Sequence, residues 1–425
     1  MPSLSIIAPP PPKENAWRFI NFKKEKKTVS PRALKEVKYD SQSHHSVLFQ
    51  MYGSVWPKVL PFCLANVGLT LIVLYLRNRQ IIDLTFSDKG HSFISMLVSF
   101  LVVSRSQMIY GRYSEARSQL SAAMRSCREL VQHMAILTLS ETDEAAKQWR
   151  CTVAYKTILM LRVLCAALEY PTSKRNAWDV PEMDDADRNV VLDSLLVATS
   201  DNSIIHCSNS KLSPRSMHEL AHGERSLSDE NLRVPVIMTY QVREAIVSQR
   251  FALSQPLQPP EELKILQFVS EFSMAFHSLR KLLMTPFPFP LVQMARTVLV
   301  FWVFSLPFVL VWNISEPIQV VMVVFVITYG FVGLEYVSME LEDPFGDDPN
   351  DFDCITFSQM VFEDIYITIN EVDGKEAANA LRRKVKNRTA VGTTHESFVA
   401  DDEFLSNVGS MEGSPLIAEN GSHDV

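Results

Sequence analysis

"GLEYVSMELEDPFGDDPNDFD" (residues 333–353) ends a long apolar run and holds eight carboxylates within nineteen residues. No lysine or arginine occurs between residues 297 and 374, so these acids have no basic neighbour along the chain. Uncompensated like charges repel one another and oppose close packing. The stretch therefore predicts an acidic loop at the end of an apolar helix, which is either bathed in water or holds a cation.

Four apolar stretches of about membrane-crossing length occur in two pairs: 59–76, 92–110, 291–312 and 318–337. A transmembrane helix needs about 20 predominantly apolar residues to cross a ~30 Å hydrocarbon core. We therefore expect an all-α membrane protein with two helical hairpins, and with both termini and the long middle segment on one side. The basic N-terminal arm indicates that this side is the cytosol.

The expected organisation along the chain has six parts. They are a cytosolic N-terminal arm (1–44), a first transmembrane hairpin (45–110), a cytosolic helical domain (111–285) with a Ser-rich loop (200–232), a second hairpin (286–340), an acidic clasp with the cytosolic helix that follows it (341–386), and a disordered acidic tail (387–425).

The bulk composition excludes several classes of protein. The formal net charge is −7 and no basic patch is visible, so we expect no nucleic-acid partner. The six cysteines form no C-x-x-C pair, which argues against a disulfide framework or a structural zinc site. The first thirty residues lack the apolar core of a secretory signal, and the sequence does not identify which membrane holds the protein.

One short motif suggests an enzyme. The sequence HELAH (218–222) fits the two-histidine pattern of zinc proteases. It lies in the Ser-rich loop rather than in an apolar helical pattern, and Arg225 stands where an extended zinc motif would continue. We interpret it as a chance match. No nucleophile–base pair is recognisable elsewhere, so the sequence predicts no enzyme and no required cofactor.

The second apolar stretch carries large apolar residues at a spacing of four. Phe93, Leu97 and Leu101 fall near one face of a helix. In a single packed bundle such a row is core. In a ring of identical subunits the same row would form an apolar collar, and narrow collars of this kind gate ions by dewetting. The residues alone leave both interpretations open.

Three arginines mark the end of the same stretch: Arg105, Arg112 and Arg117. They either form ion pairs at the membrane interface, with their stems along apolar surface, or attract anions toward a pore mouth.

The acidic stretch is a candidate site for a hard cation. Ca²⁺ takes six to eight oxygens from carboxylates, carbonyls and water. Asp347, Asp348 and Asp351 offer carboxylates on a backbone turned by Gly346 and Pro349. A solvated loop without a metal is the alternative.

Several motifs together resemble the bestrophin anion channels. These are LEDPFGDDPNDFD after the last apolar stretch, SRSQMIYGRYSEAR after the second, PFPFPLVQMARTVLVFWVFSLPFVL at the third and GSVWPKVL at the first. The similarity covers about residues 45–375, with the Ser-rich loop as an insertion.

This resemblance implies a homopentamer with four transmembrane helices per subunit and one central pore for chloride and other monovalent anions. The second helix would line an apolar neck, with Phe93 and Leu97 on neck positions. Asp348 and Asp351 match the carboxylates of a Ca²⁺ clasp in the animal members, and Asp343 stands where those proteins have Asn. Ca²⁺ is therefore implied as a regulator. A secondary anion transporter and a membrane-anchored scaffold are the alternatives.

Overall fold

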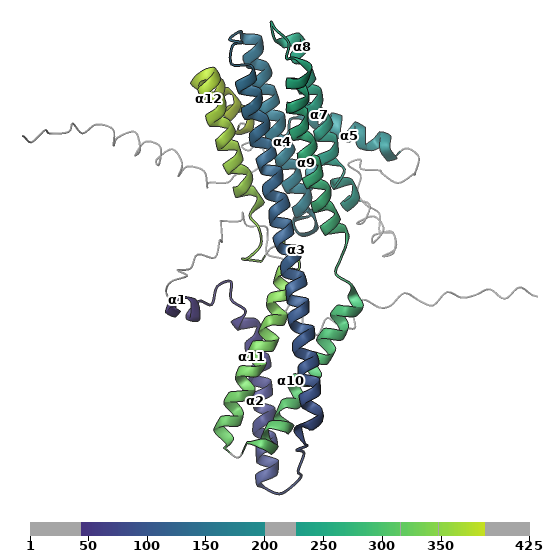
Figure 1. The fold of residues 1–425 in the computed structure, drawn as a ribbon, viewed down its shortest axis with the longest axis vertical. Helices are drawn as coiled ribbons and strands as arrows, with labels where there is room; N and C mark the ends of the chain where they lie inside the picture. The colour runs from purple at the N-terminus through teal and green to yellow at the C-terminus, as the bar shows by residue number, and fades with distance from the viewer. Residues whose placement is uncertain (1–43, 200–226, 315, 347, 387–425) are drawn as a thin grey trace, which may run out of the picture. The chain divides into compact units, whose positions relative to one another are not determined.

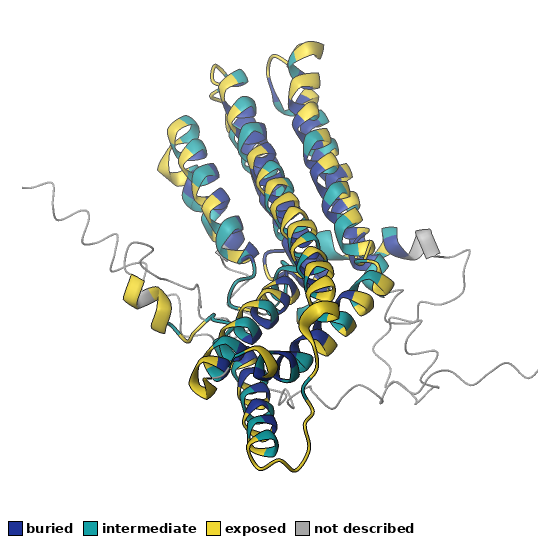
Figure 2. Cartoon of the chain, turned by 60° about the horizontal axis from the view of Figure 1, so that its bottom comes forward, coloured by how far each residue is buried: buried dark blue, intermediate teal, exposed yellow. Residues whose placement is uncertain are grey.

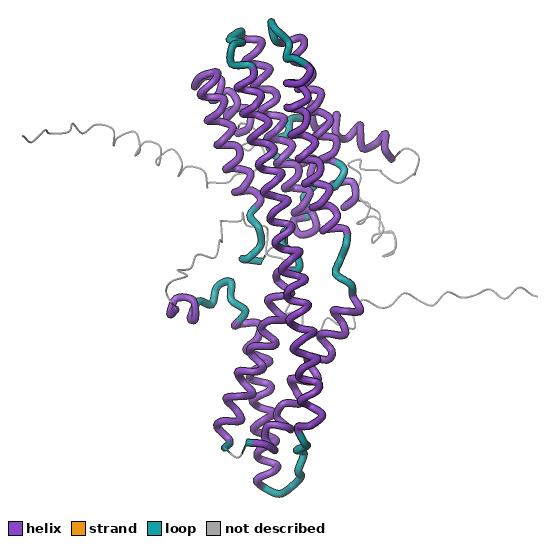
Figure 3. Tube along the Cα trace, viewed as in Figure 1, coloured by secondary structure: helices purple, strands orange, loops and turns teal. Residues whose placement is uncertain are grey.

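The computed structural model describes residues 44–199, 227–314, 316–346 and 348–386 of the 425-residue chain. Every regular element in these ranges is a helix, joined by short loops (Figure 3). The prediction of an all-α protein is confirmed.

Four apolar helices pack together into what we call the membrane bundle (Figure 1). They are α2 (Trp56–Asn78), the first half of α3 (Asp88–Leu137), α10 (Phe289–Asn313) and α11 (Pro317–Leu341). Each helix is long and apolar enough to cross a membrane. They coincide with the four stretches that the sequence predicts.

A fifth helix, α4 (Glu144–Ser173), is also apolar enough to cross a membrane. However, 72% of its most apolar window is buried inside the protein, against 22–44% for the four helices of the membrane bundle. It packs against α7 (Val234–Val247), α12 (Cys354–Lys386) and the second half of α3. Its apolar residues therefore form the core of a second, extramembrane bundle.

Helix α3 belongs to both bundles. Its 50 residues contain no proline and no break, which at ~1.5 Å per residue gives a rod of about 75 Å. Helix α9 (Pro259–Met284) runs antiparallel along its second half. Four shorter elements complete the numbered helices of the described part: α1 (His44–Phe49), η2 (Ala177–Asp179), α5 (Asp185–Thr199) and α8 (Gln249–Ala252).

A buried amide compensates for the proline inside α10. Pro307 has no N–H, so it leaves the carbonyl of Val303 without its helical partner. Asn66 of α2 donates its side-chain N–H to that carbonyl (3.0 Å) and to the hydroxyl of Thr328 on α11 (2.8 Å). Because a backbone group left unpaired in lipid costs several kcal/mol, Asn66 keeps α10 continuous and ties three helices together.

Helix α12 is a hairpin of two arms rather than one straight helix. Gly374 has φ +84°, a conformation that residues other than glycine rarely adopt. The hydroxyl of Tyr366 donates to Asn379 Oδ1 at 3.0 Å. These residues are 13 apart and would be separated by about 20 Å in a straight helix. The chain therefore turns back at Gly374.

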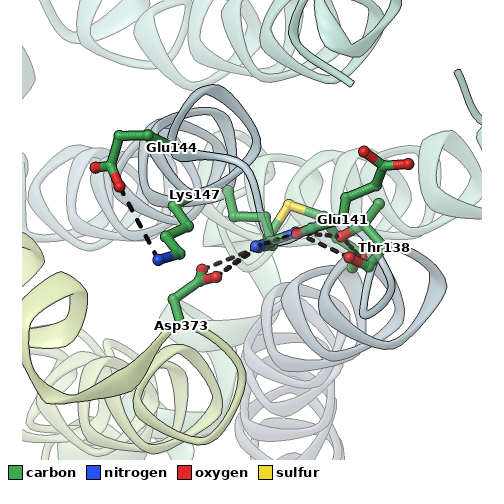
Figure 4. Close-up of polar contacts among 7 residues, drawn as sticks. Thr138, Glu141, Glu144, Lys147 and Asp373 are labelled. Atoms are coloured by element: carbon green, nitrogen blue, oxygen red, sulfur yellow. Dashed lines mark hydrogen bonds and ion pairs between the residues drawn. The ribbon is translucent and has the colours of Figure 1, made fainter. Parts of the chain in front are cut away.

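A buried ion pair fixes this hairpin to the turn between α3 and α4 (Figure 4). The side chains of Arg150 and Asp373 are 1% and 0% exposed, and Arg150 Nε donates to Asp373 Oδ2 at 2.9 Å. The same guanidinium donates to the carbonyls of Thr138 and Glu141, each at 2.9 Å. All these partners converge on one cation, so removal of the carboxylate leaves a buried charge.

We predict that Asp373→Ala destabilises the protein by about 3–5 kcal/mol, because Arg150 then stays buried and uncompensated. The matched control is Glu144→Ala, which removes a pair with Lys147 (4.0 Å) that is exposed to solvent. Exposed pairs contribute about 0–1 kcal/mol. Denaturant unfolding of the purified protein measures both, and equal losses would contradict this role of the buried pair.

Candidate functional site

The acidic stretch is partly neutralised by bases from distant parts of the chain. Glu335 of α11 forms an ion pair with Arg296 of α10 at 2.6 Å and a second one with Arg105 of α3. Arg105 is 1% exposed and also lies 3.6 Å from Glu342. The three helices are thus joined by charge where the apolar run ends.

A third basic residue, Lys58 in the first turn of α2, pairs with acids further along the stretch. Its ammonium lies 2.7 Å from Glu340 and 3.9 Å from Asp348. The sequence analysis did not identify Lys58 or Arg296. Each lies 39 or more residues away from the acids it pairs with, so neighbouring residues in the sequence gave no signal for either pair.

Asp353 has a structural role. Its carboxylate accepts hydrogen bonds from the backbone N–H and the hydroxyl of Thr356, at 3.0 and 2.8 Å. Thr356 lies in the first turn of α12, so Asp353 caps that helix and its charge complements the helix dipole.

The carboxylates of Asp343 and Asp351 approach the same glycine. A Cβ added to Gly346 would lie 2.8 Å from Asp351 Oδ2 and 3.3 Å from Asp343 Oδ2. Burial, together with the charges of Asp348, Asp343 and Glu340, raises the pKa of Asp351 to about 7, against an opposing hydrogen bond from the Asp348 N–H.

Two crowded carboxylates fit a hard cation in chemistry, since a divalent ion would relieve their repulsion. Asp347, the remaining predicted ligand, lies outside the described residues. Within the described ranges, no three His, Cys, Asp or Glu side chains gather closely enough to hold a metal by themselves. A cation here would therefore also need backbone carbonyls or water.

The acidic loop is held against both bundles. Asn350 donates to the carbonyl of Gly53 (3.2 Å), just before α2, and to Glu340 (2.9 Å). Phe345 and Phe352 are buried in the core of the extramembrane bundle. The loop therefore connects the chain before α2 with the extramembrane bundle.

The other two predicted arginines also contact the chain. Arg112 donates to the carbonyls of Leu282 (2.9 Å) and Thr285 (2.8 Å), at the C-terminal end of α9. The Arg117 guanidinium lies over the ring of Phe357, 4.1 Å from its centroid. Arg105, Arg112 and Arg117 thus all contact groups of their own chain. Their role at the membrane interface or toward anions stays a prediction.

The predicted row on α3 is partly uncovered. The helices are buried on one side and exposed on the other (Figure 2). Phe93 is 81% exposed and Leu97 51% exposed, whereas Leu101 is half-buried. A spacing of four advances 40° beyond a full turn at about 100° per residue, so the predicted row rotates away from the uncovered face.

The uncovered face instead continues through Met96 (78% exposed), Phe100 (68%) and Val103 (46%). The opposite face of α3, with Val98 and Val102, is buried against the other helices of the membrane bundle. We call Phe93, Met96, Leu97, Phe100 and Val103 the apolar row.

These features define an integral, multi-pass, all-helical membrane protein. Residues 36–366 match the family described as bacterial/fungal bestrophin protein, and the chain belongs to this family of anion channels. The resemblance seen in the sequence is confirmed. A search of curated proteins gives no match.

Solved structures agree in fold. Two variants of a bacterial bestrophin homolog from Klebsiella pneumoniae are similar to this chain, at 18% and 17% identity and a TM-score of 0.55 each. The alignments cover 72% and 75% of this chain and 99% of each homolog. A structure described only as a membrane protein has 16% identity and a TM-score of 0.56, covering 73% of this chain and 98% of its own.

The raised pKa of Asp351 gives a testable pH dependence. The folded protein holds this proton more tightly than free aspartate, whose pKa is ~3.9. Stability should therefore fall as the pH rises from about 4 to about 7, and this contribution should level off above that range. Because Asp351 is partly exposed, we expect a change on the order of 1 kcal/mol after screening.

Thermal unfolding at pH 5.5 and 7.5 measures this change. Asp351→Asn should remove the contribution and raise the melting temperature at pH 7.5. Asp348→Asn is the control. It removes only one of the charges near Asp351, so the dependence of stability on pH should become smaller but persist. An unaltered pH dependence in Asp351→Asn would rule out Asp351 as its source.

Proposed function

We propose that this protein is a passive anion channel, a homopentamer in which five copies of α3 surround one pore that conducts chloride and other monovalent anions. The observation that carries the proposal is the apolar row, which its own subunit leaves uncovered while the opposite face of the same helix is packed. Five such rows around one axis make an apolar neck, and membership of the bestrophin family supports this arrangement.

The neck selects by the cost of removing water. Large, weakly hydrated anions lose less hydration on passing through apolar surface, so they should pass more easily than small ones. Conduction also requires that no site along the path bind an anion tightly. Arg105 is the first arginine after the apolar row along α3. Its charge is paired with Glu335 and Glu342, so it does not offer a tight site for an anion.

The continuity of α10 argues against a secondary transporter. Such transporters hold their substrates at helices broken near the middle of the membrane. Pro307 is the candidate break here, but Asn66 occupies the carbonyl that the proline frees. No unwound segment results within this helix.

We infer that both termini and the extramembrane bundle lie in the cytosol. Basic residues at the N-terminal arm support this orientation by the positive-inside tendency. The acidic loop would then lie at the cytosolic end of the membrane bundle.

Substitution of the apolar row tests the neck. We predict that Leu97→Ala and Phe100→Ala increase channel opening and reduce the preference for iodide over chloride, because a wider and less apolar neck dewets less readily. The measurements are single-channel recordings in symmetric chloride and reversal potentials in mixed anions, with Phe93→Ala and Leu101→Ala in the same series.

Leu71→Ala is the matched control. Leu71 lies on α2 and is 54% exposed, against 51% for Leu97, so the same number of atoms is removed from a similarly exposed site on another helix. Unchanged opening and selectivity in both Leu97→Ala and Phe100→Ala would exclude the row as the neck.

We propose Ca²⁺ as a regulator that binds the acidic loop. Asp343, Asp348 and Asp351 would supply carboxylates, with Asp347 as a further donor. A bound divalent cation would counter the burial and the neighbouring charges that together raise the pKa of Asp351, and it would stiffen the loop between the two bundles.

We predict that Ca²⁺ raises the melting temperature of the wild-type protein and that Asp351→Asn weakens this effect by tenfold or more in Ca²⁺ concentration, or about 1.4 kcal/mol. Isothermal titration with Ca²⁺ and with Mg²⁺ measures binding without reference to current. No heat of binding and no thermal shift with wild type would reject Ca²⁺ regulation at this loop.

A further inference from the structure

The uncovered face of α3 continues beyond the membrane bundle, and its chemistry changes along the way. After the apolar row come Gln107, Ser114, Ser118 and Ser121, and then Arg125; all five are exposed. A water-facing surface is the simplest environment for such a series, because packed interfaces between helices are richer in apolar side chains.

The helix fixes the direction of these side chains. At about 100° per residue, positions 107, 118 and 125 lie within about 20° of Phe100 around the axis of α3. Because α3 is continuous, Ser118 and Arg125 point to the same side of the helix as Phe100. If Phe100 faces the axis of the proposed pore, Ser118 and Arg125 face it too. Arg125 lies about 38 Å along the helix from Phe100.

Arg125 differs from the other four arginines of α3. Arg105 and Arg128 form ion pairs, Arg112 caps α9, and Arg117 lies over Phe357. Arg125 has no hydrogen bond or ion pair with any residue in the part of the chain that the structure describes.

Acids on α3 itself and on the adjacent helix α9 have other partners. Glu129, one turn further along α3, lies 3.5 Å from the imidazole of His133. On α9, Glu271 accepts a hydrogen bond from Gln267. Glu115 is exposed on the same face, but its ten-residue separation corresponds to about 15 Å, beyond the ~8 Å Debye length at physiological salt.

We propose that Arg125 forms a ring of five positive charges in the extramembrane part of the conduction path, which concentrates monovalent anions for the pore. This inference rests on the proposed pentameric channel. Ser118 and Ser121 add hydroxyl donors that bind anions only weakly. Because the ring is several Debye lengths from the apolar row, it should change how fast anions arrive and leave their selection at the neck unchanged.

The test is the single-channel conductance of reconstituted full-length protein. Arg125→Ala should lower the chloride conductance by about twofold or more at ~50 mM salt, and the difference should fade at ~1 M, where the Debye length is ~3 Å. Arg125→Glu should lower it further, and Arg125→Lys should restore it. The ratio of iodide to chloride permeability should stay at the wild-type value in all three variants.

Arg233→Ala is the control. Arg233 is exposed at the start of α7, and its loss removes one positive charge from the extramembrane bundle, as Arg125→Ala does. If wild type conducts and Arg125→Ala matches Arg233→Ala at low salt, the proposal for Arg125 is overturned and the channel stands. If wild type does not conduct at all, the proposed function fails first. Conductance that depends on Arg125 only at low salt supports the ring.

Discussion

The unbroken course of α3 is the constraint on which the other features depend. A helix of 50 residues without a break carries one register from the membrane bundle into the extramembrane bundle. The side chains that face away from its own subunit are therefore fixed in direction over the whole length. Any assembly that covers the apolar row must also position Ser118 and Arg125, and this couples the chemistry of the membrane part to that of the other bundle.

The acidic stretch shows how charge is managed at the end of the membrane bundle. Three bases from α2, α3 and α10 converge on acids of α11 and the loop, although none of them is near these acids in the sequence. Such convergence makes the boundary a place where four helices are held by charge as well as by packing. The carboxylates of Asp343 and Asp351 crowd together at Gly346, and their mutual repulsion contributes to the raised pKa of Asp351, after the larger effect of burial.

The sequence predicted the helical class, the four apolar helices and the family, because apolar length and motif order are local signals. It could not supply the partners of the acids, since pairs such as Lys58 with Glu340 depend on the packing of distant helices. It also placed Phe93, Leu97 and Leu101 in one row, whereas a spacing of four drifts around a helix and Leu101 is half-buried. The turn at Gly374 had one glycine as its only signal, and the bases that compensate the acidic loop had none.

In the proposed pentameric channel, distance separates the roles of the apolar row and of Arg125. In the proposed channel, the apolar row would act on an anion through contact and loss of water, which are effects of a few ångströms. A charge acts over a Debye length of about 8–10 Å and is screened beyond it. Since Arg125 lies about 38 Å from Phe100, neither group can do the work of the other. Selection and supply of anions can therefore change independently, one through the size of apolar side chains and the other through charge on the exposed face of α3.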